Sequence, residues 1–396
     1  MKLAILTQYF YPETGAPQNR LYELSKKFKE SGWEIKVITG MPNYPKGKIF
    51  PGYKWKFCSS EKIDNIDVMR YWLYASISRK KLPRIISMLS FSITSLFSCL
   101  RLKKFKPDFL FIESPPLTLG YTGYILSKFT GAKMIMNVSD IWPLSAKELG
   151  AIGEGKIYKK LEVLEKFLYG KAFLNTGQSE EITAHIKNSG DFNTYLFRNG
   201  VDINRFKQPV ALRDSGEKIK IVYAGLLGVA QGISGIVSNI NFSELNAEFH
   251  IYGEGAERNE IFKFAESNPD SGIILHKSVN SNEIPEVLSE YYCTIIPLVN
   301  KIYGAVPSKI YEAMAAGVPI LFSGTGEGAT IISDNKIGLV SAPKDYTGLK
   351  ENIIKIKDSL ILRNKMADNC RKTAADKFDR NVLIKKFSEK LVSYLN

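Results

Sequence analysis

The chain has 396 residues, more than one hydrophobic core usually serves, so we expect two domains. Apolar residues make up 44% and charged residues 24%, an ordinary globular composition that excludes a disordered chain. The formal net charge of +14 calls for an anionic partner, which nucleic acid, a membrane surface or a phosphorylated substrate would supply. Scattered cysteines, and no histidine at metal-ligand spacing, indicate neither a disulfide framework nor a zinc site.

The first predicted strand lies in the N-terminal segment MKLAILTQYF. Its apolar run is too short for the core of a signal peptide, so we expect a cytoplasmic protein. Short apolar runs then alternate with helical patterns, which predicts a parallel, doubly wound α/β sheet. The segments are LAILT, 19–31, EIKVIT, DFLFIE, 117–129, KMIMNV, AFLNT, 179–188 and TYLF.

Segment 78–106 interrupts this alternation with a mostly apolar run between two basic ends. Serines at 87, 90, 92, 95 and 98 make the run too polar and too short for a spanning helix. We interpret it as a helix that lies in a membrane interface with its cations at the headgroups. The alternative is a buried helix with solvated ends. The cations are Arg79, Lys80, Lys81, Arg84, Arg101, Lys103, Lys104 and Lys106.

A polar stretch at 207–217 precedes a second alternation, which begins near Ile219. We predict a first domain over 1–205, completed by a C-terminal helix at 378–396, and a second domain over 206–377. Two such Rossmann-like domains would face each other across a cleft at the carboxyl ends of their strands, where ligands bind by default. The strand segments of the second domain are KIKIVYAG, EFHIYG, GIILH, CTIIPL, PILFS and GLV.

The segment VPSKIYEAMAAGVP predicts a short helix with clear ends, from about 307 to 316. Pro307 suits a first helical turn and Gly317 suits a left-handed cap. Lys309 and Glu312, three residues apart, share one face, and the simplest alternative is a surface ion pair. The following GTGEG at 324–328 precedes a helical start at ATIIS, so its amides are predicted to receive a diphosphate.

Several longer segments occur in order along the whole chain. They are YFYPETGAPQNRLYELSKKFKESGWEIKVITGMPNYPKG, ESPPLTLGYTGYILSKFTGAK, NVSDIWPLSAKELG, FRNGVDINRF, YGEGAER, PSKIYEAMAAGVPI and GEGATII. Together they resemble the family 4 glycosyltransferases of the GT-B fold, especially the branch that builds bacterial O-antigen and capsular polysaccharides. The resemblance implies a retaining, metal-independent enzyme that binds a nucleotide-sugar mainly on its C-terminal domain.

The resemblance also implies roles for individual residues. Glu312 corresponds to the glutamate that accepts hydrogen bonds from the ribose hydroxyls, and Gly15 faces the donor diphosphate or the reacting sugar. Asp140 lies in the region that reaches the sugar and the acceptor, although it could instead cap the turn before Trp142. The predicted catalytic residues are Asp140, Lys309 and Glu13. The predicted donor-binding residues are Gly15, Gly225, Lys309, Glu312, Gly324, Thr325, Gly326 and Glu327, and the predicted acceptor-binding residues are Tyr9, Tyr11 and Arg20.

Two positions depart from the family pattern. Many members have a first glutamate eight positions before the second, where this chain has Gly304. Many also hold the diphosphate with an arginine and a lysine, where YAGLLGVAQG offers Leu226 and Gln231. We therefore expect Lys309 to be the main cation for the phosphates, with Lys301 second.

The expected reaction moves a sugar from UDP, an N-acetylated amino sugar by analogy, to a polyprenyl-diphosphate-linked or glycan acceptor. We expect no metal and no other cofactor, no nucleic-acid partner, and a peripheral location on the inner face of the cell membrane. No Asp-x-Asp motif occurs, and His185, His250 and His276 stand apart in the sequence, so no general base is evident. The alternatives are a UDP-sugar 2-epimerase of the same fold and, in another class, a basic nucleic-acid-binding protein.

Overall fold

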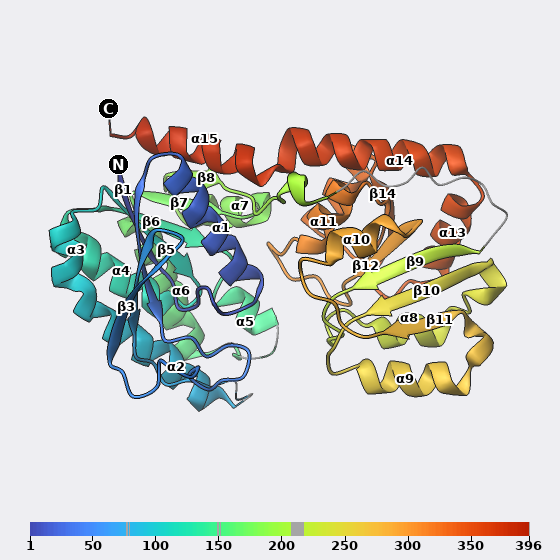
Figure 1. Ribbon diagram of the computed structural model, residues 1–396, viewed down its shortest axis with the longest axis horizontal. Helices are drawn as coiled ribbons and strands as arrows, with labels where there is room; N and C mark the ends of the chain where they lie inside the picture. Colours follow the sequence, from blue (N-terminus) through green and yellow to red (C-terminus); the bar gives the residue numbers. More distant parts are fainter. Residues whose placement is uncertain (77, 79, 149, 151, 207–217, 396) are drawn as a thin grey trace. The chain divides into compact units, whose positions relative to one another are not determined.

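The computed structural model describes residues 1–76, 78, 80–148, 150, 152–206 and 218–395, and it divides the chain into two units (Figure 1). Unit 1 comprises Met1–Arg198 and Asn381–Asn396, and unit 2 comprises Asn199–Arg380. The predicted domain boundaries lie at 205/206 and 377/378, whereas in the structure residues 199–205 and 378–380 belong to unit 2. The predicted polar stretch 207–217 and Arg79 lie outside the described residues.

Unit 1 is built on an eight-stranded sheet in the order β3-β4-β2-β1-β5-β6-β7-β8. Neighbouring strands are parallel, as predicted, except β3 and β4, which form an antiparallel hairpin that the sequence analysis did not predict. The strands are β1 (Lys2–Leu6), β2 (Glu34–Gly40), β3 (Cys58–Ile63), β4 (Ile66–Tyr71), β5 (Phe109–Ser114), β6 (Lys133–Val138), β7 (Leu174–Gly177) and β8 (Thr194–Leu196).

Alternation along the strands sends side chains to two differently covered faces of this sheet. On one face Phe109 and Phe111 share a core cluster with Phe28 of α1 and Phe387 of α15. On the other face Ile112 contacts α4 so closely that a Cβ added at Gly123 would lie 2.0 Å from it. The helices are α1 (Ala16–Glu30), α4 (Leu117–Thr130), α5 (Leu144–Glu148), α6 (Lys156–Lys171), α7 (Glu180–Ser189) and α15 (Arg380–Val392).

The basic apolar segment is helical throughout as α2 (Lys81–Thr94), a 3₁₀ turn η1 (Ser95–Ser98) and α3 (Cys99–Phe105). In the described part of the chain, Leu82–Phe105 is the one helical stretch long and apolar enough to cross a membrane by length and composition. The expectation that it is too short was therefore wrong, because the helix continues into the basic residues that follow the apolar run. Its serines 87, 92, 95 and 98 are buried. The Ser92 hydroxyl bonds to Thr118 of α4 at 2.9 Å, so the polar side of the helix faces the body of unit 1.

Unit 2 is built on a six-stranded, fully parallel sheet in the order β11-β10-β9-β12-β13-β14. Its strands are β9 (Ile219–Ala224), β10 (Ala247–Tyr252), β11 (Ile273–His276), β12 (Cys293–Pro297), β13 (Ile320–Ser323) and β14 (Gly338–Ser341). Its helices are α8 (Ile233–Asn239), α9 (Arg258–Ser267), α10 (Ile284–Ser289), α11 (Ser308–Ala316), α12 (Glu327–Asn335), α13 (Tyr346–Lys357) and α14 (Leu360–Thr373).

The limits of α11 confirm the prediction made from its end residues. Pro307 is the residue before the helix, and Gly317 ends it in the left-handed conformation with φ of 68°. Between them Ile310, Tyr311 and Met314 are buried in the core, which fixes the direction of the remaining face. Lys309 and Glu312 project from that face.

Candidate functional site

Lys309 lies directly against the backbone at the carboxyl end of β9. A Cβ built at Gly225, the first residue after that strand, would lie 2.2 Å from Lys309 Cε and 2.4 Å from Nζ. The Lys309 ammonium also lies 5.4 Å from the centroid of the Tyr223 ring. Burial lowers the pKa of Lys309, and the charge of Glu312 opposes this shift. Only glycine at 225 leaves room for this poorly solvated cation.

Glu312 lies on the same face of α11 but is not paired with Lys309. Burial raises the pKa of Glu312, while the charges of Lys309 and Arg205 lower it. Both α11 side chains are described and half-buried, and no ion pair joins them. The alternative of a surface ion pair therefore does not hold. A cation and a carboxylate that do not neutralise each other leave both groups to a ligand.

The glycine segment 324–328 lies between β13 and α12, as predicted, but its amides are not all available. The Gly324 amide donates to the Ser341 carbonyl oxygen at 3.0 Å, so the predicted contact of this amide with a diphosphate is wrong in this structure. Helix α12 begins at Glu327, two residues before the predicted start, and Gly326 precedes it with φ of 80°. Thr325 is exposed and Glu327 is buried. The Ala329 amide in the first turn of α12 donates to the Gly326 carbonyl oxygen at 3.0 Å. The positive end of this helix dipole thus comes directly after a strand.

The loops after β9 and β10 are held together at the same edge of the sheet. The Gly225 amide donates to the Tyr252 carbonyl at 2.8 Å, and the Leu227 amide donates to the Glu254 carbonyl at 2.9 Å. A Cβ at Gly253 would lie 2.0 Å from the Gly225 oxygen, so this approach requires glycine. The rigid pair of loops fixes the backbone on which Lys309 rests.

Gln231, in the loop after β9, carries a buried side-chain oxygen, Oε1, that has no hydrogen-bond partner among the described residues. A buried unpaired acceptor is unfavourable by about 1–3 kcal/mol, which a ligand hydroxyl would offset. In the sequence, Gln231 stands out only because it occupies a place where many family members have a phosphate-binding cation. The burial of one of its atoms depends on how the loop packs, and no pattern in the sequence signals it.

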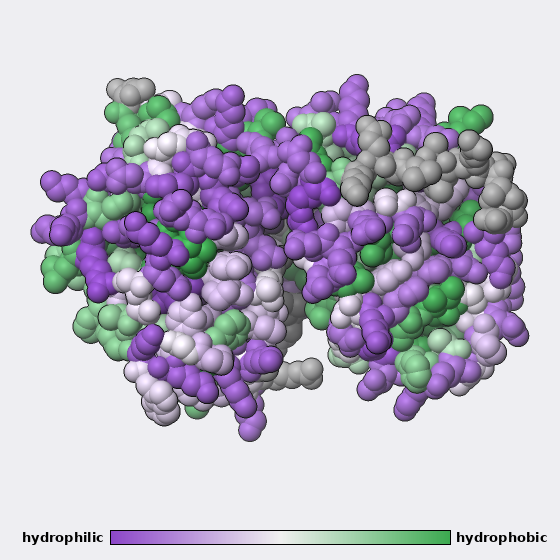
Figure 2. All heavy atoms as spheres, in the orientation of Figure 1, coloured by the Kyte–Doolittle hydropathy of each residue, from purple (hydrophilic) through white to green (hydrophobic). Residues whose placement is uncertain are grey.

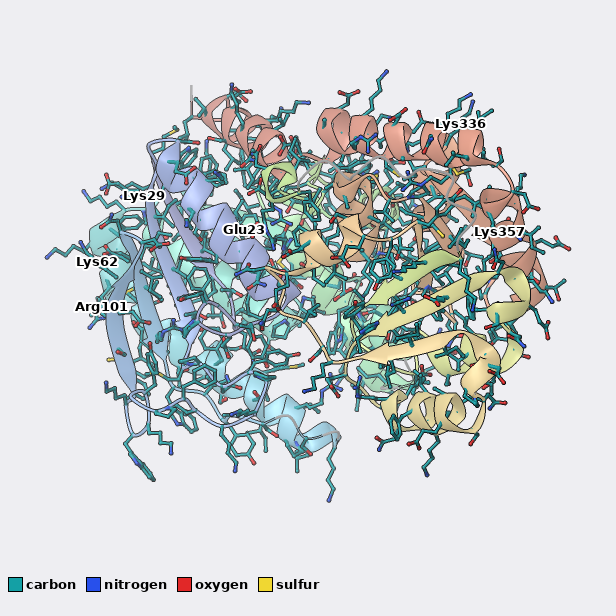
Figure 3. All side chains as sticks on the ribbon, turned by 45° about the vertical axis from the view of Figure 1, so that its right-hand side comes forward. Glu23, Lys29, Lys62, Arg101, Lys336 and Lys357 are labelled. Carbon is teal, nitrogen blue, oxygen red and sulfur yellow. The ribbon has the colours of Figure 1, made fainter. Side chains whose placement is uncertain are left out.

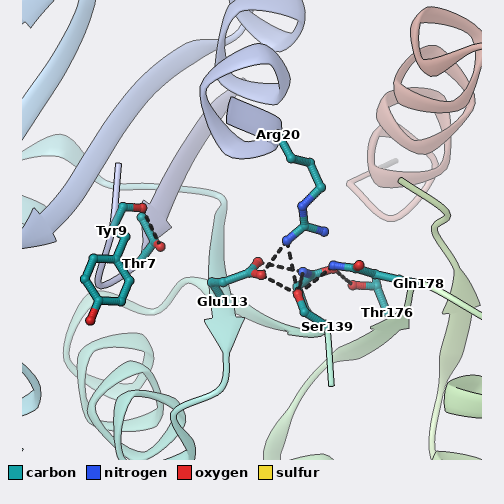
Figure 4. A network of polar contacts seen from close by, with 8 residues as sticks. Thr7, Tyr9, Arg20, Glu113, Ser139, Thr176 and Gln178 are labelled. Carbon is teal, nitrogen blue, oxygen red and sulfur yellow. Dashed lines mark hydrogen bonds and ion pairs between the residues drawn. The ribbon is translucent and has the colours of Figure 1, made fainter. Parts of the chain in front are cut away.

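In unit 1 a polar network joins the carboxyl ends of three strands (Figure 4). Arg20 of α1 forms a buried ion pair with Glu113 of β5, and both residues contact the Ser139 hydroxyl after β6. Asn137 donates to Glu113 at 2.7 Å and accepts from the Thr176 hydroxyl of β7 at 2.7 Å. Arg20, predicted to bind the acceptor, is thus held by a carboxylate that the sequence analysis did not single out.

Asp140 follows this network and is exposed. In the structure as described, its carboxylate has no hydrogen-bond partner, so the alternative role as a turn cap is not supported. Partial desolvation and then the charge of Glu113 raise the pKa of Asp140, and the charge of Arg20 opposes the shift. The exposed carboxylate is free to contact a ligand.

Glu13, predicted to be catalytic, ties two loops together. It is only 1% exposed, and its carboxylate accepts the backbone N–H groups of Phe10 at 3.0 Å, Asn43 at 2.8 Å and Tyr44 at 2.9 Å. Burial nevertheless raises the pKa of Glu13. These bonds join the loop after β1 to the loop after β2. We therefore describe Glu13 as a positioning residue for the loop that carries Gly15.

The two predicted acceptor tyrosines lie in the loop after β1, and one of them adjoins α2. Tyr11 is 43% exposed and stacks on Tyr22 with ring centroids 4.7 Å apart. Tyr9 is half-buried; burial and the charge of Glu13 raise its pKa to about 12, and Arg84 of α2 opposes this. The neighbouring Gln8 donates to Ser87 of α2 at 3.3 Å. The start of the basic apolar segment therefore borders this edge of the sheet.

Two of the three histidines do not stand apart as predicted. His250 Nδ1 lies 2.9 Å from His276 Nε2, because β10 and β11 are neighbouring strands. His276 also stacks on Tyr252, with ring centroids 4.2 Å apart. His185 contacts Glu165 at 3.0 Å in unit 1. These contacts account for all three rings within the fold.

Comparison with protein families identifies the part of the chain that carries the Lys309 site. Residues 204–373 match the family described as Glycosyl transferases group 1. This segment is therefore similar to group 1 glycosyl transferases. The match covers nearly all of unit 2, including Gly225, Lys309 and Glu312, and it includes no part of unit 1.

Most of the chain is similar in sequence to one glycosyl transferase, and the whole chain is similar in fold to solved structures. It is 24% identical over 336 residues to the putative colanic acid biosynthesis glycosyl transferase WcaI of Escherichia coli K12, covering 80% of this chain and 82% of that protein. Sucrose-phosphate synthase from Thermosynechococcus elongatus superposes with a TM-score of 0.76 at 15% identity, over 100% and 99% of the two chains. Anabaena Alr3699/HepE, solved with UDP and glucose, gives 0.70 at 14% identity, over 99% and 100%. The fold is therefore GT-B, as the sequence predicted.

Proposed function

We propose that this protein transfers a sugar from a UDP-sugar to a lipid-linked saccharide acceptor in surface polysaccharide biosynthesis, with retention of anomeric configuration and without a metal. The observation that carries the proposal is the Lys309 ammonium, which burial desolvates, which lies against Gly225 and which forms no ion pair with a described residue, inside the segment that matches group 1 glycosyl transferases. A desolvated cation at the carboxyl edge of a parallel sheet is suited to a diphosphate. Similarity to WcaI and to HepE, whose structure holds UDP and glucose, supports the choice of reaction and of donor.

In the proposed step, the acceptor oxygen forms a bond to the anomeric carbon while the bond between that carbon and the UDP oxygen breaks. The acceptor proton passes to the departing phosphate oxygen on the same face of the sugar. Negative charge develops on the diphosphate, where the Lys309 ammonium and the positive end of the α12 dipole stabilise it more than in the ground state. Glu312 accepts hydrogen bonds from the ribose hydroxyls.

The remaining polar groups are assigned to the reacting sugars. The buried Oε1 of Gln231, which has no partner among the described residues, accepts a hydrogen bond from a hydroxyl of the donor sugar. It thereby takes the role of the first glutamate of many family members, whose position Gly304 occupies in this chain. Asp140, whose carboxylate is exposed and has no hydrogen-bond partner among the described residues, contacts the acceptor or the transferred sugar. The Arg20 and Glu113 pair acts through Ser139 to position the loop that carries Asp140.

We also propose a cytoplasmic location at the inner face of the membrane, because the basic apolar segment exposes its apolar side. Leu82, Ile93, Phe97 and Leu100 are between 59% and 71% exposed, whereas four of the five serines of the same helix are buried. Hydrophobic side chains gather beside hydrophilic ones at the outer edge of unit 1, where α3 lies (Figure 2). Such a surface suits a headgroup interface. The contact between Gln8 and Ser87 brings this helix to the acceptor edge, which supports a lipid-linked acceptor.

The test uses purified protein, a panel of UDP- and GDP-sugars, and a polyprenyl-diphosphate-linked acceptor. UDP is expected to raise the melting temperature, and Glu312→Ala is expected to abolish that rise. Sugar transfer is expected to continue in EDTA. UDP release without an acceptor would favour the epimerase instead. Stabilisation by UDP that survives Glu312→Ala would remove Glu312 from the site.

A further inference from the structure

A basic hollow lies at the amino-terminal edge of the unit 1 sheet, beside α3. Its volume is about 670 Å³, and neither the comparisons nor the proposed reaction uses it. Lys62 and Arg101 project at the same outer edge of unit 1 (Figure 3). The cations that line it are Lys2 at the start of β1, Lys36 on β2, Lys62 on β3, and Arg101 and Lys104 on α3.

The charges in this hollow do not cancel. Its two carboxylates have partners, because Glu61 pairs with Arg70 and accepts from the Tyr53 hydroxyl, and Asp67 lies 3.9 Å from Lys62. Of the remaining four cations, Lys2 pairs with Glu34 at 3.6 Å. By contrast, Lys36, Arg101 and Lys104 form no ion pair with any described carboxylate. The Lys36 ammonium lies 4.7 Å from the centroid of the Phe105 ring, and Arg101 donates to the Ser60 hydroxyl at 2.6 Å. Lys104 also lines the hollow.

The hollow is separate from the acceptor edge of the sheet. Lys2 is the first residue of β1, and Lys36 and Asp67 lie near the starts of β2 and β4. Glu113 and Ser139, by contrast, lie at the carboxyl ends of β5 and β6. In a parallel sheet these are opposite edges, so an anion in the hollow is not the acceptor in its reactive position.

The hollow is continuous with the exposed apolar side of the helix. Phe97, just before α3, packs against Phe57, just before β3, with ring centroids 5.2 Å apart. The same two elements, α3 and β3, then form walls of the hollow. Leu100, 71% exposed, adjoins Arg101 in the sequence. An anion seated here would therefore lie at the rim of an apolar surface, as a phosphate lies at the rim of the acyl region of a bilayer.

We infer that this hollow binds the phosphate headgroup of an anionic phospholipid while the adjoining apolar side of α2 and α3 enters the interface. The inference rests on the proposed association with the membrane and adds a second point of attachment to it. The segment runs from Ser87, bonded to Gln8 at the acceptor edge, to Phe105 at the opposite edge. A headgroup held at one end orients the other end, with Tyr9 and Asp140, toward lipid-linked substrates.

The test measures binding of the full chain to vesicles of phosphatidylcholine with or without phosphatidylglycerol. The variant Arg101→Gln with Lys104→Gln removes two cations of the hollow. At about 1 kcal/mol for each cation near an anionic surface, we expect affinity for phosphatidylglycerol vesicles to fall about 30-fold. The matched control, Lys385→Gln with Lys386→Gln, removes two exposed cations from α15 on the other face of the sheet, and little change is expected.

A second variant, Phe97→Asp with Leu100→Asp, separates this inference from the membrane proposal. We expect it to weaken binding to both kinds of vesicle, whereas Ile361→Asp, at an 84% exposed site in unit 2, should not. Equal loss with the α15 control would overturn the headgroup site and leave the membrane proposal intact. Vesicle binding unaffected by Phe97→Asp and Leu100→Asp would overturn both. Affinity for soluble glycerophosphate or for oligonucleotides equal to that for vesicles would also overturn the lipid assignment.

Discussion

The close contact between Lys309 and Gly225 leads to a prediction that a double-mutant cycle can test. In Gly225→Ala the new Cβ would lie 2.2 Å from Lys309 Cε, so the end of the lysine must move by at least 1.2 Å to reach the 3.4 Å at which ordinary contact begins. The substitution also strains the backbone, because φ at this residue is +149°. That strain lowers stability by about 1–3 kcal/mol without involving the ligand.

The expected loss in UDP affinity follows from the displaced ammonium. A hydrogen bond to a charged group contributes about 1.5–3 kcal/mol, so we expect Gly225→Ala to weaken UDP binding by about 10- to 150-fold. Lys309→Met should weaken binding by a similar factor. If both changes act through the same ammonium, the double variant should bind no more weakly than Lys309→Met alone.

Isothermal titration calorimetry at a temperature where all variants are folded would give the four affinities. Gly32→Ala is the control for backbone strain, because Gly32 has φ of +85° and no atom within 4 Å of an added Cβ. It should lower stability and leave UDP binding unchanged. Additive losses in the double variant would refute the account in which Gly225 acts by seating Lys309.

Three further predictions follow from other groups. UDP affinity should fall as the pH rises through the pKa of Lys309, and at a lower pH than for an exposed lysine, because burial lowers this pKa. It should also fall as the pH drops through the raised pKa of Glu312, so titrations of wild type and Glu312→Gln should differ at the acidic side. Arg20→Met leaves buried Glu113 without its cation and should lower the free energy of unfolding by about 3–5 kcal/mol in urea, against less than about 1 kcal/mol for Arg371→Met at the exposed pair with Asp368. Gln231→Leu removes a buried unpaired acceptor, so it should raise stability by about 1 kcal/mol while it lowers kcat/KM for the UDP-sugar and leaves UDP affinity intact; an unchanged kcat/KM would remove Gln231 from the site.

Features with local causes were predictable from the sequence. The ends of α11 follow from Pro307 and Gly317, which act on their own turns whatever surrounds them. The β3–β4 hairpin also has a local signal that the sequence analysis missed. Asp64 and Asn65 both have positive φ, 46° and 61°, which is typical of the two-residue turn that joins antiparallel strands.

Features that depend on strand order were not predictable in the same way. Glu113 and Ser139 come together because β5 and β6 are neighbours, and Arg20 reaches them from a helix 93 residues earlier in the chain than Glu113. Nothing local distinguishes Glu113 from other acidic residues near strand ends. The resemblance predicted a catalytic role for Glu13 from its position alone. Only the structure shows that its carboxylate accepts hydrogen bonds from three backbone N–H groups.

The orientation of α2 and α3 was equally hidden, because helical periodicity separates two stripes without saying which one is buried. Here the serine stripe is inside and the large apolar side chains are outside, the reverse of a surface helix in a soluble protein. Full burial of a large apolar side chain contributes about 1.5–3 kcal/mol, so Leu82, Ile93, Phe97 and Leu100 leave roughly 4–8 kcal/mol unrealised at their observed exposures. That is comparable to the whole stability of a domain. The membrane contact that we propose would cover these side chains with another apolar phase, and the cations at the ends of the helix favour an anionic bilayer over a second protein chain.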